Sequence, residues 1–372
     1  ANTRYNGTQV LNGTFSAKSL QVGTMSGEEI NFTIDSVESA LLGAYIMAGE
    51  SSAGAYAAAT ATTTGYTSAT NLTDDADDIT IVGNGKTRTV DISANDSAKD
   101  VAKKINSVAG ATNVFSMART YAHLFSGSAT TTAYQVSING TSTAAFNISS
   151  SDVSDAVAKI NAIYSTTGVM ASATTDNKVL LTDSDGDDMI ITNGSTGTDL
   201  DVQGVKSDGE TVAGSAVSLA ANGSSNNDTT KVVGTQRLTS SSGFTVTQTN
   251  GGTDDTWFAD GTTTAALESV AVVDISTQIG ASYSIATIDG ALETVSGMRG
   301  SLGTLQNRLS YSVSNLMKVT EYTIGARSRI QDADFAAETS RLAKAQVLQQ
   351  AGASMLSQAN ASTDVVLQVL RG

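Results

Sequence analysis

Clustered carboxylates are the side chains in this sequence whose spacing comes closest to metal-binding chemistry. Asp183, Asp185, Asp187 and Asp188 lie within six residues, and a similar acidic run occupies 74–78. Carboxylate oxygens are the ligands that Ca²⁺ prefers. The spacing differs from that of an EF-hand, however, and acidic clusters with glycine also form ordinary turns before strands. We therefore predict no metal site, and retain these four aspartates as weak candidates for calcium.

The chain has few of the residue types on which other kinds of catalysis depend. The chain has no cysteine and a single histidine, His123, so thiolate nucleophiles, disulfides, thiolate metal sites and His-dependent triads are disfavoured. Carboxylate pairs could serve a glycosidase, but acidic turns are common and sequence cannot place two of them at the required separation. His123 lies among Tyr121 and Phe125 and is interpreted as structural. We therefore expect that the protein is not an enzyme and that it binds no cofactor.

The only tryptophan, Trp257, is followed by Phe258. Such an aromatic pair could form a ligand platform or could plug the end of a small β domain. The second interpretation is favoured, because a unit of about 55 residues buries little core by itself.

The carboxyl-terminal ninety residues carry the strongest pattern. From Ile288 onward the apolar residues are spaced by three and four positions, as in a coiled-coil seam: Ile288, Leu292, Val295, Met298, Leu302, Leu305, Leu309, Val313, Leu316 and Val319. This spacing predicts a rod helix from 282 to about 325, some 65 Å long at 1.5 Å per residue. A narrow apolar stripe on such a helix requires a partner helix.

We predict a break near Gly325 and a second helix after it, because Asp332 and Asp334 suit a helix amino terminus. From 347 to 372 the only charges are Asp364 and Arg371. The many glutamine, serine and asparagine side chains there are nevertheless too polar for a bilayer span. This composition favours burial among copies of the same helix, with a frayed terminal tail as the alternative.

The middle of the chain, about 50–269, predicts a β-rich region with an internal repeat. Asn84-Gly85 recurs 55 residues later as Asn139-Gly140, and each pair suits a two-residue hairpin turn. Each hairpin precedes a predicted short helix, at 97–108 and at 152–163. Ser97 could cap the first helix, and either Ser151 or Asp152 the second. A predicted strand at 270–277 leads back to the rod.

Charge is unevenly distributed. The formal net charge is −15, yet residues 271–372 hold 8 basic and 8 acidic side chains, so the whole surplus of negative charge lies before them. Like-charged surfaces stay soluble and resist wrong association, whereas a neutral segment can pack against copies of itself. Binding to nucleic acid and to anionic membranes is disfavoured, because both require a basic surface.

Several segments resemble bacterial flagellin. They are Ile288-Asp289-Gly290-Ala291-Leu292, Leu305-Gln306-Asn307-Arg308-Leu309, 328–336, 344–346, 348–351 and 358–360 near the carboxyl end, and 1–13 with 16–23 at the other end. The two hairpin modules, about 78–120 and 133–192, are similar to an insert found in flagellins and hook-associated proteins. The sequence differs from the flagellin pattern at two places. Gln331 stands where a glutamate is common, and residues 361–364 lack the proline that is usual there.

The resemblance implies an α+β multidomain subunit of the flagellar filament, outside the cell and exported by the flagellar type III route; a chain without cysteine or proline suits threading in an unfolded state. It divides the chain into an amino-terminal remainder of the rod domain (1–48), an outer β-rich acidic variable region (49–269), a rod helix (270–326) and an inner-core helix (327–372). Assembly would rest on seam residues, joint residues and inner-helix residues: Leu302, Leu305, Leu309 and Leu316; Arg327, Arg329, Asp332, Asp334 and Phe335; Leu348, Met355, Leu356, Leu367 and Leu370.

Partners implied by the resemblance are other flagellin subunits, an export chaperone, and hook-associated and cap proteins. In flagellins, the segment resembling 1–23 lies about a hundred residues into the chain, so we expect the preceding rod helices to be missing here. Two alternatives remain open: a hook-associated junction protein, and a cell-surface adhesin or glycan-binding homologue.

Overall fold

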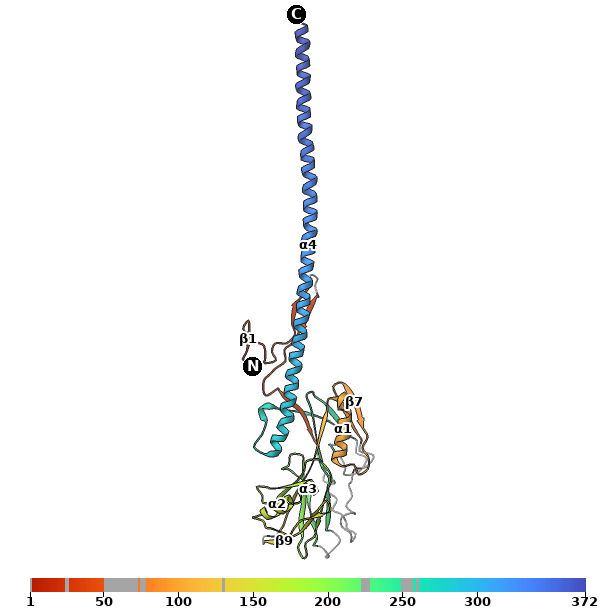
Figure 1. The fold of residues 1–372 in the computed structure, drawn as a ribbon, viewed down its shortest axis with the longest axis vertical. Helices are drawn as coiled ribbons and strands as arrows, with labels where there is room; N and C mark the ends of the chain where they lie inside the picture. Colours follow the sequence, from red (N-terminus) through yellow and green to blue (C-terminus); the bar gives the residue numbers. More distant parts are fainter. Residues whose placement is uncertain are drawn as a thin grey trace. The chain divides into compact units, whose positions relative to one another are not determined.

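The computed structural model describes residues 2–23, 27–49, 73, 78–128, 131–221, 228–248, 257–258 and 261–372. The predicted acidic run at 74–77 lies outside them. The fold is mixed α+β, with several antiparallel sheets and one 92-residue helix, α4 (Gln278–Val369). Contacts divide the chain into a β-rich unit, 1–15 with 34–298, and a helical unit, 16–33 with 299–372. Figure 1 shows the elements.

The first module of the β-rich unit begins with the hairpin of β6 (Ile79–Gly83) and β7 (Lys86–Val90). Asn84 and Gly85 turn between them with φ of 49° and 66°, which confirms the predicted Asn-Gly turn. Helix α1 (Ala98–Thr112) follows, and Ser97 caps it in a reciprocal capping box with Asp100. β20 (Thr245–Gln248) and β21 (Gly261–Thr264) complete this module's sheet, in the order β21-β20-β6-β7.

The second module also contains a hairpin that turns at an Asn-Gly pair. β10 (Val136–Ile138) and β11 (Thr141–Ser142) are joined by Asn139 and Gly140, whose φ angles are 48° and 82°. Helices α2 (Ser154–Asn161) and α3 (Tyr164–Thr167) follow. The predicted cap was wrong, because the residue at the N-cap of α2 is Val153, and its side chain makes no capping bond. Asp152 instead accepts a hydrogen bond from the Ser154 amide at 2.9 Å.

Short strands complete the second module. β15 (Met189–Asn193) and β18 (Thr229–Val232) extend its sheet in the order β11-β10-β15-β18. β9 (Thr132–Tyr134) pairs with β12 (Phe146–Ile148). Tyr134 and Phe146 are both fully buried there, with ring centroids 6.5 Å apart.

The long strand β8 (Phe115–Phe125) joins the two modules within an eight-stranded sheet. Its first half pairs with β19 (Thr235–Ser240), and its second half pairs with β14 (Val179–Asp183) on one side and β16 (Leu200–Val205) on the other. The remaining strands of this sheet are β13 (Val169–Ala173), β17 (Val212–Leu219), β5 (Gly43–Ala48) and β22 (Ala266–Ser269).

Each module has its own apolar core. Ala118 of β8 belongs to the core of the first module, and Ala122 and Leu124 to that of the second. Trp257 and Phe258 are 7% and 1% exposed and lie in the first core, which supports the interpretation as a plug. A strand that contributes to two cores ties the modules together, because neither core can unfold without disturbing β8.

The predicted strand at 270–277 was wrong. β22 ends at Ser269, and a 3₁₀ turn occupies Val270–Val272 before α4 begins. The predicted break near Gly325 was also wrong, because α4 passes through Gly325 without interruption. A glycine costs an α-helix only about 1 kcal/mol relative to alanine, and this chain has no proline to stop the helix.

The amino-terminal residues form small hairpins. β1 (Arg4–Tyr5) pairs with β2 (Thr8–Gln9) in the β-rich unit. β3 (Lys18–Gln21) pairs with β4 (Glu29–Phe32) in the helical unit. Ile30 of this second hairpin is 5% exposed, although most of its neighbours are exposed.

Candidate assembly interface

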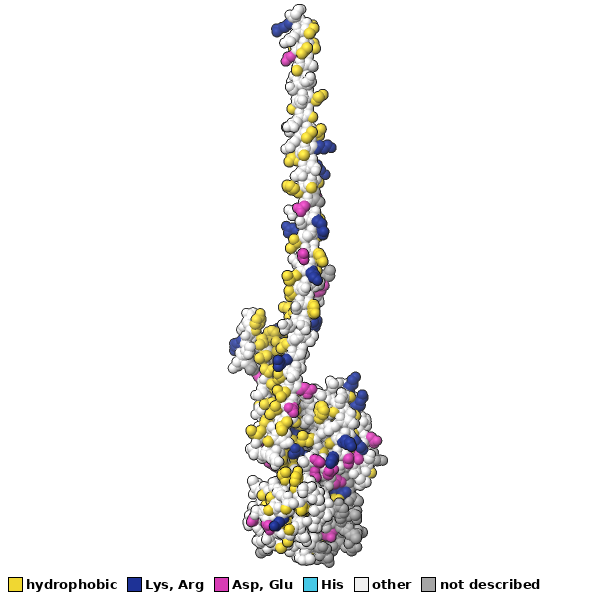
Figure 2. Space-filling model, in the orientation of Figure 1, with side chains coloured by type: hydrophobic (Ala, Val, Ile, Leu, Met, Phe, Trp, Pro, Cys, Tyr) yellow, Lys and Arg dark blue, Asp and Glu magenta, His cyan; other side chains and the backbone are white. Residues whose placement is uncertain are grey.

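Helix α4 exposes an unusual number of large apolar side chains. From residue 302 onward these include Leu302, Tyr311, Val313, Met317, Val319, Tyr322, Ile324, Ile330, Phe335, Leu342, Val347, Leu348, Met355, Leu356, Val365, Val366, Leu367 and Val369. Figure 2 shows the apolar side chains distributed along the helix. Soluble monomers rarely expose so much contiguous apolar surface, and such a surface marks a place where another surface binds.

The predicted seam residues share one stripe of α4. Leu305, Leu309 and Leu316 are half-buried, whereas the helix positions around them are mostly exposed. Leu302, at 38% exposed, lies at the margin of this stripe. Leu309 follows Leu305 by four residues and Leu316 follows Leu309 by seven, and these spacings place the three leucines on the same side of the helix. The structure therefore brings the predicted seam together along one stripe.

The predicted joint residues lie in the middle of a continuous helix. Arg327, Arg329, Asp332 and Asp334 are exposed, and Phe335 is 72% exposed. The Ser328 hydroxyl donates a hydrogen bond to Asp332 at 3.0 Å. No helix end exists here for the aspartates to stabilise, so their predicted role at a helix amino terminus was wrong.

The predicted inner-helix residues are also exposed. Leu348, Met355, Leu356 and Leu367 have exposed fractions of 59–70%, and Leu370 follows the end of the helix at 79%. Few charges interrupt this segment. The exposed side chains therefore offer apolar surface with little electrostatic cost for covering it.

The weak calcium candidates have lysine partners. Lys99 Nζ lies 2.8 Å from Asp187 and 3.4 Å from Asp185, and Lys231 Nζ lies 3.5 Å from Asp188. Hydrogen bonding to Asp187 chiefly raises the pKa of Lys99, and burial raises the pKa of Asp183. Over the described ranges, no group of three or more histidine or acidic side chains is arranged to hold a metal ion.

Sequence reasoning missed the residues that dock the start of α4 onto the β-rich unit. Two guanidinium groups lie near the Tyr283 ring, with Arg237 Cζ 4.2 Å and Arg119 Cζ 5.6 Å from its centroid. The Tyr283 hydroxyl donates to the backbone carbonyl of Ser207, and burial raises the pKa of Tyr283 above its ordinary range. Arg237 also pairs with Glu268 at 2.6 Å. Their wide separation along the chain left no sequence pattern that could reveal this cluster.

The absence of a side chain at Gly290 also allows the start of α4 to pack against the β-rich unit. A Cβ atom at Gly290 of α4 would lie 2.8 Å from the Ala44 Cβ atom and 2.9 Å from the Gly43 carbonyl oxygen. The helix therefore approaches β5 more closely than a residue with a side chain would allow. In the described part of the chain, no helix is apolar enough over a sufficient length to cross a bilayer.

Comparison with known proteins gives matches at both parts of the molecule. Residues 285–370 match the bacterial flagellin C-terminal helical region, and residues 78–114 match the flagellin hook IN motif. The B-type flagellin of Pseudomonas aeruginosa is 34% identical over 285 residues, which are 75% of this chain and 57% of that protein. Flagellin B of Vibrio cholerae is 46% identical over 101 residues, 27% of each chain. Flagellin B of Vibrio anguillarum is 45% identical over 108 residues, 28% of this chain and 29% of its own length.

The fold and the exposed helix define an α+β protein whose long carboxyl-terminal helix carries many exposed apolar side chains. The matched segments coincide with that helix and with the first hairpin module. The chain belongs to the bacterial flagellin family. It spans 57% of the length of the B-type flagellin and about a quarter of the Vibrio flagellins that it matches.

Proposed function

We propose that this chain is the structural subunit of a bacterial flagellar filament, located outside the cell and serving motility. The observation that carries the proposal is the exposed apolar surface of α4 from 302 to 369, which falls within the matched flagellin C-terminal helical region. Covering apolar surface contributes about 25 cal/mol per Å². A helix this exposed gains stability when other subunits cover it.

In this proposal, α4 belongs to a coiled-coil rod. Leu302, Leu305, Leu309 and Leu316 face a partner helix along the rod. Arg327, Arg329, Asp332, Asp334 and Phe335 contact a neighbouring subunit. The segment with the fewest charges lies innermost, because removing it from water costs the least free energy. It contains Leu348, Met355, Leu356, Leu367 and Leu370.

The remaining chain forms the outer, acidic and variable part of the subunit. The proposed boundaries are 1–48 and 270–326 for the rod domain, 49–269 for the outer region and 327–372 for the inner core. The negative charge before residue 271 supports exposure to the medium, since it keeps outer surfaces of neighbouring subunits apart.

We propose further that the two hairpin modules are repeats. In the first module, the Asn106 side chain donates to the Ser116 carbonyl at 2.9 Å and accepts from the Ser116 amide at 2.8 Å. In the second, Asn161 makes the equivalent pair of bonds to Ala171, at 2.9 and 2.8 Å. The same side chain thus fixes the helix to the following strand in both modules.

The proposed partners are other copies of this subunit, with an export chaperone and hook-associated and cap proteins implied by the family. The proposed export route is the flagellar type III pathway. The absence of proline and cysteine is compatible with this route, because the chain can pass unfolded without slow prolyl isomerisation or disulfide rearrangement.

Seeded polymerisation of the complete gene product tests the proposed interface. Phe335→Asp and Leu356→Asp should each reduce pelletable filament at least tenfold, because a charge would be buried between subunits. Val212→Asp is the matched control, since Val212 is an exposed apolar residue of β17 in the β-rich unit. Electron microscopy of the pellets and the fluorescence of Trp257 would report filaments and folding respectively. Normal filament growth by both helix variants would contradict the assigned interface.

A further inference from the structure

The sheet of β13, β14 and β8 has two unlike faces. Alternate residues on one face, including Ala171, Leu181 and Ala122, lie in the core of the second module. The opposite face carries Ser172, Leu180 and His123 in register across the three strands, because Ser172 pairs with Leu180 and Leu180 pairs with His123. This opposite face is therefore mixed polar and apolar.

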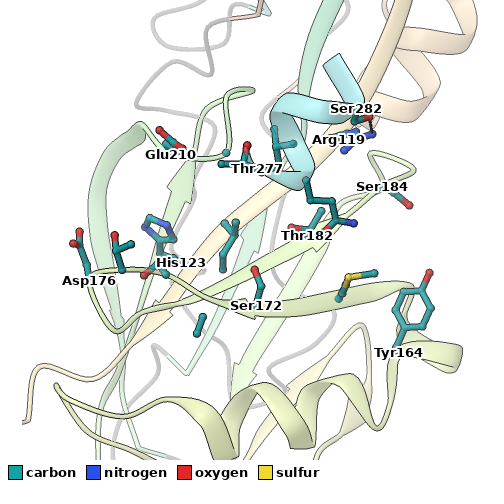
Figure 3. Close-up of a pocket in the computed structure, with 18 of the residues that line it drawn as sticks. Arg119, His123, Tyr164, Ser172, Asp176, Thr182, Ser184, Glu210, Thr277 and Ser282 are labelled. Carbon is teal, nitrogen blue, oxygen red and sulfur yellow. Dashed lines mark hydrogen bonds between the residues drawn. The ribbon is translucent and has the colours of Figure 1, made fainter. Parts of the chain in front are cut away.

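Part of that face is covered by the start of α4, and the uncovered part is a cavity. Ile279 packs against Tyr121, Leu180 and Val205. Beside this contact lies an open cavity of about 760 Å³, a volume within the range of ligand sites. Figure 3 shows His123, Ser172 and Thr182 along its floor, with Asp176 and Glu210 on its walls. All of these residues belong to the β-rich unit.

His123 is the polar group in this cavity that most requires a partner. Its side chain is 7% exposed, lines the cavity and makes no hydrogen bond with any described residue. A neutral imidazole can donate one hydrogen bond and accept another. A buried polar group left without partners is costly, and such a group calls for a bound water or ligand.

Other polar groups in the cavity could bind the same ligand as His123. Among the described residues, no hydrogen bond or ion pair engages the hydroxyls of Ser172 and Thr182 or the carboxylates of Asp176 and Glu210, and the charge of Asp176 acts on His123. Met170, 40% exposed, and Tyr164, 44% exposed, add apolar surface at the rim. The cavity thus combines hydroxyls, carboxylates and a buried imidazole with apolar side chains at its rim.

This combination discriminates between ligand classes. Arg119, the arginine in the lining, uses its terminal nitrogens within the chain, since it donates to Ser282 at 2.6 Å and to the Tyr121 hydroxyl at 3.4 Å, and its buried Nε is the atom without a partner among the described residues. The two carboxylates would repel an anion, which disfavours phosphates and acidic sugars. An apolar guest would leave the hydroxyls and the imidazole without partners. A guest with many neutral hydroxyls and an apolar ring face satisfies both kinds of surface.

We propose that this cavity binds a neutral saccharide of one or two rings. Its hydroxyls would donate to the carboxylates of Asp176 and Glu210 and exchange hydrogen bonds with His123 and Thr182. The C–H face of a sugar ring would lie on Leu180 and Met170. This binding is separate from filament assembly and can be tested on the unassembled chain.

Saturation-transfer NMR with the full chain tests the site. Glucose, galactose, N-acetylglucosamine and lactose are the neutral probes, and N-acetylneuraminate and glucosamine are the anionic and cationic ones. We expect saturable binding of at least one neutral sugar and none of N-acetylneuraminate. Thr182→Val, which keeps the shape and removes the hydroxyl, should weaken that binding about fivefold.

Thr239→Val is the matched control, because Thr239 is a half-buried strand threonine of β19 outside the cavity. The affinity of this variant for the neutral sugar should equal that of the unaltered chain. Ser172→Ala provides a second test should Thr182→Val fail to fold, as judged by Trp257 fluorescence. Binding of no neutral sugar, binding of a charged probe alone, or unchanged affinity in both cavity variants would overturn the proposal.

Discussion

His123 illustrates how much one residue's surroundings determine its chemistry. The sequence places it among aromatic residues, and the structure places it on β8, where it lines a cavity. Burial, and secondarily the charge of Lys178, lowers the pKa of His123 below its ordinary value of 6.5, while Asp176 acts in the opposite direction. The folded chain therefore resists protonation of this imidazole.

This shift predicts a pH dependence of stability. Because the folded pKa lies below the unfolded value, the unfolded chain binds the proton more readily, and the free energy of unfolding should fall as pH drops below about 6.5. His123→Gln should flatten this decline, since the chain has no other histidine. Urea unfolding followed by Trp257 fluorescence between pH 7.5 and 5.5 measures the effect. An equal slope in both proteins would show that His123 does not couple to folding.

The contact between α4 and the β-rich unit is the most informative feature at the scale of elements. The helix is joined to the sheets by the Tyr283 and Arg237 interactions, and by a hydrogen bond of 2.9 Å from Thr287 to Glu268. A cation over an aromatic ring contributes about 0.5–2 kcal/mol, depending on how far it is removed from water. Gly290 adds a close backbone approach to β5. These contacts hold the first turns of α4, up to residue 298, within the β-rich unit.

Gly290→Val should destabilise this contact by about 1–3 kcal/mol, because the new side chain would collide with Ala44 and the Gly43 carbonyl. Gly297→Val is the matched control, since nothing lies within 4 Å of a Cβ atom at that position. It should change stability by no more than about 0.5 kcal/mol. Urea titrations of the two variants provide the comparison, and equal stability would contradict the close packing.

At the scale of the whole molecule, charge and apolar surface are kept apart along the chain. The excess negative charge precedes residue 271, and the neutral carboxyl-terminal segment carries the exposed apolar side chains. In the proposed filament, self-association through the helix would work against repulsion between the acidic regions. The balance between these two effects depends on salt, because only the repulsion is screened.

Polymerisation should accordingly accelerate when NaCl rises from about 0.01 M to about 0.1 M, where the screening length falls from about 30 Å to about 10 Å. Light scattering of the seeded complete gene product would follow the rate. Replacement of NaCl by sucrose at equal osmolality is the control for osmotic effects. A rate that decreases with salt would indicate that opposite charges, rather than apolar contacts, dominate assembly.

The sequence by itself determined the features that depend on residues close together in the chain: the Asn-Gly turns, the Ser97 cap of α1 and the helical periodicity of α4. Its composition also showed how few side chains are suited to catalysis. It failed at Gly325, because a weak local signal for a break was outweighed by the helix-forming residues on both sides. Only the tertiary structure decided how β8 joins two cores, how Tyr283 meets Arg237, and where His123 faces a cavity. These arrangements depend on pairings between distant residues, whose free energy is gained only when the sheets are complete and leaves no periodic trace in the chain.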